Sequence, residues 1–131
     1  MNEHSSGRVT FEWRGQFDSS EVNALHAEAF RHPVLEDDWR SQVERHSLGW
    51  VCARDNRELV GFVNVPWDGG THAFISDTIV AANARRQGIG TQLVAIAAAE
   101  ARAAGCDTLT SMTTCVPSTS TPAASGPVMQ D

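Results

Sequence analysis

Two arginines and two glycines stand together at the start of the most apolar segment of this 131-residue chain. The segment contains Arg85, Arg86, Gln87, Gly88, Ile89, Gly90 and Thr91. Glycine has no Cβ atom, so Gly88 and Gly90 allow the backbone to approach a ligand closely. A helix that begins here points its free N–H groups and the positive end of its dipole at that ligand. Because arginine also suits phosphate, the pattern predicts a pyrophosphate site. The alternative is an ordinary glycine-containing turn between a strand and a helix.

Hydrophobic periodicity predicts the elements that position this loop. In chain order they are a strand at 9–13, a helix that begins between 18 and 20, a short helix near 37–45, strands at 48–53, 59–65 and 72–80, and a helix from 89 to about 104. Pro33 ends the first helix, because proline cannot continue it. Gly105 is a natural stop for the last helix. The strand at 72–80 therefore leads directly into the loop.

The spacing Arg-x-x-Gly-x-Gly differs from the dinucleotide fingerprint and from the Walker A loop, which needs a terminal Gly-Lys-Ser/Thr. It resembles the acetyl-CoA loop of the GNAT family of N-acetyltransferases, and the order of predicted elements over residues 8–106 is similar to that family's. The resemblance implies an α/β fold with a mixed central sheet flanked by helices. The last strands and helix of the family fold are expected to be missing. Residues 8–112 would then form the acetyl-CoA-binding domain.

The same resemblance implies how acetyl-CoA, as co-substrate, is bound. Residues 85–91 would hold its pyrophosphate, and Thr78 and Val80 would offer backbone groups to the pantetheine arm, which pairs like an added strand. Val80 matches the valine ahead of the family's loop. Ala82 stands where many relatives carry proline.

Acetyl transfer to an amine needs a base, a group that polarises the thioester and a proton for the leaving thiolate. The backbone N–H of Val80 is expected to polarise the thioester. Asp77 is the candidate base, with the alternative that it only orders the strand end, and His72 is the second candidate. Acidic side chains that would favour a cationic amine are Glu28, Asp37 and Asp38, although a solvated helix face also explains them. Relatives commonly use a tyrosine as the acid, and this chain has no tyrosine.

Composition narrows the partners and the compartment. A formal charge of −6 and a pI of about 5.2 argue against binding to nucleic acid. Neither a signal peptide nor a membrane-spanning segment is expected. The cysteines, Cys52, Cys106 and Cys115, are odd in number and unpaired in pattern, which is typical of reduced thiols in the cytoplasm. The scattered histidines lack the spacing of a metal site. The expected partners are therefore acetyl-CoA and an amine.

Residues 113–131 differ in composition from the rest, because threonine, serine, proline and alanine dominate them. Such a low-complexity segment is expected to stay disordered. A sheet without its final strands exposes an edge, which invites a homodimer. Two functions remain open: an N-acetyltransferase acting on a small molecule or peptide amine, and an acyl-CoA-binding remnant or pseudoenzyme with little turnover. A different anion-binding α/β domain is a weaker third possibility.

A frameshift after Gly105 accounts for both the unusual tail and the missing tyrosine. Met112 has only the codon ATG, so its last base joined to the first two of Thr113 gives an aspartate codon. With suitable wobble bases the shifted frame reads an acidic, apolar strand followed by Arg-Pro-Phe-Tyr, which resembles the family's continuation. The alternative is a genuine low-complexity tail. Sequencing of the gene is expected to show an open shifted frame beyond Gly105 that contains this tyrosine; stop codons there contradict the hypothesis.

Overall fold

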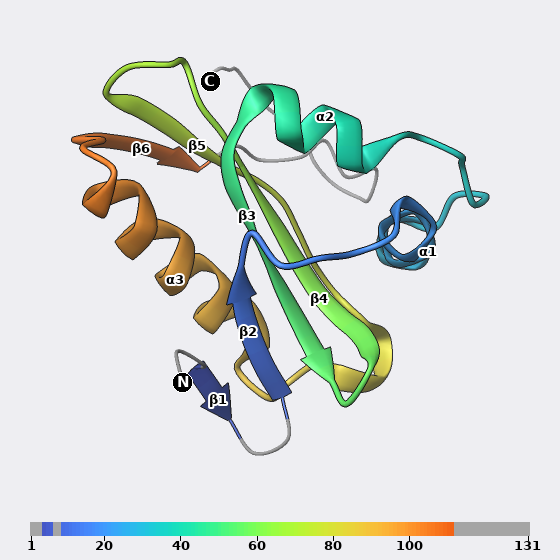
Figure 1. The fold of residues 1–131 in the computed structure, drawn as a ribbon. Helices are drawn as coiled ribbons and strands as arrows, with labels where there is room; N and C mark the ends of the chain where they lie inside the picture. Colours follow the sequence, from blue (N-terminus) through green and yellow to red (C-terminus); the bar gives the residue numbers. More distant parts are fainter. Residues whose placement is uncertain (1–3, 7–8, 112–131) are drawn as a thin grey trace, which may run out of the picture.

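The structure is built around a mixed β-sheet (Figure 1). The computed structural model describes residues 4–6 and 9–111, and within them six strands lie in the order β1-β2-β3-β4-β5-β6. The strands are β1 (His4–Ser6), β2 (Val9–Trp13), β3 (Ser47–Asp55), β4 (Glu58–Pro66), β5 (His72–Val80) and β6 (Thr108–Ser111). Neighbours from β1 to β5 are antiparallel, whereas β6 is parallel to β5. The parallel step requires a crossover, and a helix supplies it.

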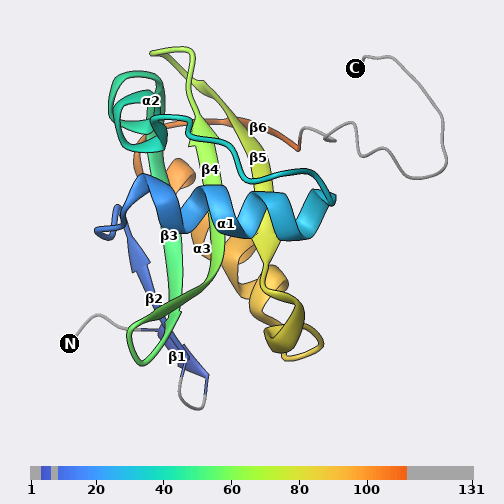
Figure 2. The ribbon, with the colours of Figure 1, turned by 90° about the vertical axis from the view of Figure 1, so that its right-hand side faces the viewer.

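Helices cover both faces of this sheet. Those described are α1 (Ser19–Phe30), α2 (Trp39–His46) and α3 (Ile89–Ala103), with a short 3₁₀ turn, η1 (Ala82–Ala84). The crossover helix α3 lies on one face, and α1 and α2 lie on the other (Figure 1). Turning the molecule shows that α1 runs across β3, β4 and β5 (Figure 2). The sheet is therefore buried on both sides, which explains why β3 and β4 are apolar almost throughout.

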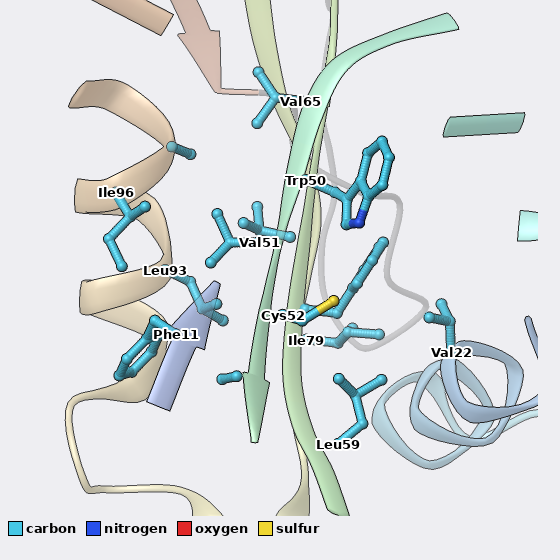
Figure 3. Close-up of a cluster of buried hydrophobic side chains, with 14 of the residues drawn as sticks. Phe11, Val22, Trp50, Val51, Cys52, Leu59, Val65, Ile79, Leu93 and Ile96 are labelled. Atoms are coloured by element: carbon cyan, nitrogen blue, oxygen red, sulfur yellow. The ribbon is translucent and has the colours of Figure 1, made fainter. Parts of the chain in front are cut away.

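Two apolar layers result, one on each side of the sheet (Figure 3). The layer beneath α3 includes Phe11, Val51, Val65, Leu93 and Ile96, and the layer beneath α1 includes Val22, Trp50, Cys52, Leu59 and Ile79. Gly61 of β4 controls how close α3 comes. A Cβ atom at this position would lie 3.1 Å from Ile89 Cγ2 and 3.2 Å from Leu93 Cδ1. A larger residue would therefore push the start of α3 away from the sheet.

Polar contacts fix α1 and the segment that follows it. Glu21 accepts two hydrogen bonds from the Arg54 guanidinium of β3, at 2.9 and 3.0 Å, and these bonds lower the pKa of Glu21. The buried Asn23 donates from Nδ2 to the carbonyl of Asp37 at 3.0 Å and accepts from Trp39 Nε1 at 3.0 Å. Both side-chain groups of Asn23 are satisfied, so the segment between α1 and α2 is held against α1.

The predicted fold class is confirmed: the chain has a mixed sheet flanked by helices, and the described strands and helices end at Ser111. The strands predicted at 9–13 and 72–80 have the observed bounds, and α3 stops as expected. Cys106 donates its N–H to Ala101 and Gly105 to Arg102, with Gly105 at φ +95°, which is a Schellman ending. Sequence patterns missed β1 and η1, which are only three residues each. The predicted tail at 113–131 lies outside the described residues.

Two adjacent residues of α3 test whether packing against the sheet holds this helix. Leu93 is completely buried, whereas Val94 is 38% exposed. Leu93→Ala is expected to lower the free energy of unfolding by about 2–5 kcal/mol, since it leaves a cavity beneath the helix. Val94→Ala is expected to change it by less than about 0.5 kcal/mol. Urea denaturation of both variants checks this, and equal losses would show that α3 does not pack as described.

Candidate functional site

The loop between β5 and α3 presents backbone N–H groups at the surface. Arg86 and Gly88 have positive φ angles, +68° and +76°, and α3 begins immediately after Gly88. The first bond of the helix runs from Gln92 N–H to the Gly88 carbonyl at 3.0 Å. The N–H groups of residues 89–91 therefore have no partner within the helix. A Cβ atom at Gly88 would meet nothing within 4 Å, so a ligand can approach the backbone there.

The edge of β5 beside this loop points its backbone outward at Val80. Ala81 donates its N–H to the Val60 carbonyl at 2.8 Å, and Val80 lies opposite Gly61. Directions alternate along an antiparallel ladder, so the N–H and carbonyl of Val80 point away from β4. The Val80 carbonyl accepts a hydrogen bond from Arg85 Nε at 3.3 Å, in agreement with this direction. Among the described residues, β6 pairs only with positions 72–75 of β5 and leaves this part of the edge uncovered.

A bulge in β5 places Asp77 under α1. The register changes from Phe62 opposite Ile79 to Asn64 opposite Ser76, so β5 has one extra residue there. Asp77 has φ +56°, in the left-handed region that aspartate tolerates better than most residues. Bulges of this kind redirect a side chain and are frequent near active sites. Asp77 Oδ2 accepts a hydrogen bond from Ser76 Oγ at 3.0 Å, and its side chain is 18% exposed.

Two histidines, His26 and His32, form a chain of contacts from Asp77 to the segment after α1. His26 Nε2 lies 3.7 Å from Asp77 Oδ1, and His26 Nδ1 lies 2.7 Å from His32 Nε2. His32 Nδ1 is 2.6 Å from the carbonyl oxygen of Pro33. The His26 ring also contacts Phe30 and Trp39, with ring centroids 4.6 and 5.6 Å away. Burial lowers the pKa of His26 below 6.5, and the negative charge of Asp77 opposes this shift without cancelling it.

The other predicted site residues do not all gather here. His72 begins β5, stacks on Phe74 and hydrogen-bonds to Thr110 Oγ1 at 2.8 Å. Five steps along β5, a distance of roughly 16 Å, separate it from Asp77, so the two candidate bases do not lie at one site. Glu28 of α1 accepts from Ala82 N–H at 3.2 Å, next to the loop. Asp38 caps α2 by accepting from Ser41 N–H at 3.1 Å.

One open cleft lies near the loop and another lies at the other end of α3. One, of about 470 Å³, lies between α1 and the segment after β5, and Glu21, Glu28, Glu58 and Asn83 line it with Leu25 and Leu59. The other, of about 560 Å³, lies between the end of α3 and β6, far from the loop. The smaller cleft includes Glu28 and Ala82, next to the loop, but neither Asp77 nor His26 lines it.

Metal ligands are not grouped in the described part of the chain, where no three histidine, cysteine, aspartate or glutamate side chains stand close enough to hold an ion. Cys52 and Cys106 are buried free thiols, and burial raises the pKa of Cys52 to about 12, so it is not a reactive nucleophile. Of the helices described, none has the length and apolar character needed to cross a membrane.

Comparison with known families identifies the fold. The model of the acetyltransferase (GNAT) family matches residues 12–124, most of the chain, and the chain therefore belongs to this family. The glycine loop at the start of α3 and the open edge of β5 lie within the matched range. No curated protein matches the sequence.

Solved structures agree with this assignment at the level of fold. A GNAT family protein from Streptococcus pneumoniae TIGR4 is 23% identical, with a TM-score of 0.65 over 83% of this chain and 78% of that one. A ribosomal-protein-alanine N-acetyltransferase from Brucella melitensis biovar Abortus 2308 is also 23% identical, with a TM-score of 0.64 over 83% and 82%. N-acetylglutamate synthase from Neisseria gonorrhoeae, complexed with coenzyme A and N-acetyl-glutamate, is 20% identical, with a TM-score of 0.64 over 82% of this chain and 26% of that one.

Sequence reasoning did not single out His26 and His32. They are six residues apart, and only the passage of α1 over β5 brings His26 to Asp77. The left-handed Arg31, φ +57°, reverses the chain after α1 and brings His32 back to His26. A histidine on the sheet-facing side of α1 was the one available signal, and it has no meaning until the strand beneath it is known.

Proposed function

We propose that this chain is an acetyl-CoA-dependent N-acetyltransferase that acts on an amine of a small molecule or peptide. The observation that carries the proposal is the helix start at Gly88, whose free N–H groups lie beside the outward-facing backbone of Val80. Family membership makes acetyl transfer the expected chemistry. The placement of these groups gives each part of acetyl-CoA a binding partner.

The pyrophosphate is assigned to the loop of residues 85–91. Three N–H groups at the start of α3 and the positive end of its dipole favour an anion at this point. The exposed side chains of Arg85, Arg86 and Gln87 add donors around it. A phosphate can approach Gly88 because this residue has no side chain in front of the backbone. A Cβ atom at Gly90 would contact Val80 Cγ2, so Gly90 lies beside Val80.

The pantetheine arm and the thioester are assigned to β5. An extended amide chain can pair with the backbone of Thr78 and Val80 as an additional strand. Because the Val80 N–H points away from β4, it can donate to the thioester oxygen, where negative charge develops during attack by the amine. When pantetheine pairs with Val80, the hydrogen bond from Arg85 Nε to the Val80 carbonyl has to break. The pantetheine amide then replaces Arg85 as the donor at the surface.

The acceptor amine is assigned to the α1 side of β5, where Asp77 lies. Negative charge from Asp77 and Asp37 favours a protonated amine at this point, and the net charge of −6 extends the preference over the whole surface. Asp77 lies on the same strand as Val80, three residues before it. The free thiols Cys52 and Cys106 suit a reducing compartment, so we assign the reaction to the cytoplasm.

A second candidate, acetyl-CoA binding with little turnover, is favoured by one specific observation. The chain contains no tyrosine, so the leaving thiolate lacks the phenolic acid that relatives commonly use. General acid catalysis is typically worth about a hundredfold or more. Release of free thiol from acetyl-CoA in the presence of an amine distinguishes the two candidates, because both predict binding and only the first predicts saturable turnover.

Two glycines with the same backbone conformation test the assignment of the loop. Gly88 and Gly69 have φ +76° and +85°, and a Cβ atom at either position meets nothing within 4 Å. Gly88→Glu places a negative charge in front of the free N–H groups and is expected to weaken acetyl-CoA binding about tenfold or more, as measured by calorimetry. Gly69→Glu adds the same charge and the same backbone strain in the turn after β4, so its affinity is expected to match the wild type.

Equal affinity of the wild type and the Gly88 variant would contradict the assignment. Tighter binding of ATP or NAD than of acetyl-CoA would contradict the proposed cofactor and favour a different anion-binding domain.

A further inference from the structure

The contact between His26 and His32 admits only one arrangement of protons when both rings are neutral. The Pro33 carbonyl can only accept a hydrogen bond, so His32 Nδ1 carries the proton that it donates at 2.6 Å. His32 Nε2 is then an acceptor. His26 Nδ1, 2.7 Å away, must carry a proton to donate to it. The remaining nitrogen of His26, Nε2, is therefore unprotonated.

The free lone pair of His26 faces Asp77. The distance from His26 Nε2 to Asp77 Oδ1 is 3.7 Å, which is too long for a direct hydrogen bond. A single ammonium nitrogen placed beside the two atoms can reach both at about 3 Å and donate to both. Both side chains retain some exposure, 21% for His26 and 18% for Asp77, so an amine can enter from solvent.

We propose that His26 is the general base of the acetyl transfer, that His32 is a positioning residue which holds His26 in its Nδ1–H form, and that Asp77 binds the incoming ammonium and then stabilises the imidazolium. The inference rests on the proposed function and assigns the base that the function requires. It also changes the role of Asp77, from base to partner of the base.

The proton balance of the step is simple. An N–H bond of the ammonium breaks, a bond from that proton to His26 Nε2 forms, and the amine nitrogen recovers its lone pair. The amine then forms a C–N bond with the thioester carbonyl carbon, and the C–S bond breaks as the thiolate leaves. A second proton from the nitrogen goes to the thiolate, and the imidazolium releases the first proton to water. The reaction thus yields an amide, a free thiol and one proton.

The surroundings of His26 keep it neutral until an amine arrives. Phe30 and Trp39 cover part of the ring, and this partial burial lowers its pKa. The charged groups that face it are Asp77 from β5, and His32 and Asp37 from the segment after α1. A general base works best when it is unprotonated at the working pH, and lowering the pKa of His26 from its ordinary value favours this neutral form.

The first test is the protonation state of His26 in the full-length protein, read from the ¹⁵N chemical shifts of its ring at pH 7.5. We expect protonated Nδ1 and unprotonated Nε2. His32→Leu should turn this single form into a mixture, because leucine offers no acceptor to the proton on His26 Nδ1. Protonated Nε2 in the wild type would overturn the inference, because that nitrogen then has no lone pair to accept a proton. This measurement needs no turnover.

The second test is the pH profile of thiol release from acetyl-CoA, with spermidine and a lysine-containing peptide as probe amines. His26→Gln is expected to lower kcat about a hundredfold or more. In the wild type, protonation of His26 should lower kcat/KM at acid pH, and the variant should lack this decrease. The KM for acetyl-CoA should stay within about twofold, since His26 lies on the acceptor side. His46→Gln, at an exposed histidine in the last turn of α2, is the matched control and should behave like the wild type.

Wild-type kcat in the His26 variant, or an unchanged acid limb, would overturn the inference. Failure of the wild type to bind acetyl-CoA in calorimetry would instead contradict the proposed function, so the two failures are distinguishable. Circular dichroism of the His26 variant checks that it folds.

Discussion

The close packing of α3 on β4 at Gly61 is the constraint on which the site depends. Ile89 and Leu93 occupy the space that a side chain at Gly61 would fill, and this contact fixes the first turn of α3 beside the end of β5. Only then do the free N–H groups of the helix and the outward N–H of Val80 stand next to each other. Neither feature alone would select acetyl-CoA, because many helices begin with free N–H groups and many strands have an exposed edge.

The extra residue in β5 positions the groups on the opposite face of the sheet, beneath α1. The bulge gives Asp77 its left-handed backbone, and Asp77 lies beneath α1, 3.7 Å from His26. The groups that we assign to the cofactor and those that we assign to the acceptor amine therefore meet on one strand, β5. Val80 points its backbone along the plane of the sheet, while Asp77 projects from it toward α1. Only three positions of β5 separate Asp77 from Val80, roughly 10 Å along the strand.

The sequence predicted the parts of this arrangement that depend on local patterns. Gly88 indicated the helix start, and Gly105 its end, because both positions have the positive φ that few other residues adopt. The bulge and the positive φ of Asp77 left no signal, since aspartate is common at strand ends. The sequence did not predict the role of His26 for a different reason, because that role depends on which strand α1 crosses. The contacts of Asn23 and Glu21 with distant segments determine how α1 crosses the sheet.

We infer that acetyl-CoA lies across the start of α3 and along the edge of β5. Titration of ¹⁵N-labelled protein with acetyl-CoA, followed by amide chemical shifts, tests it most directly. The largest changes are expected on Gly88, Gly90 and Val80, whose N–H groups would receive the ligand. Changes centred on the larger cleft between the end of α3 and β6, around Arg102 and Leu109, would contradict it.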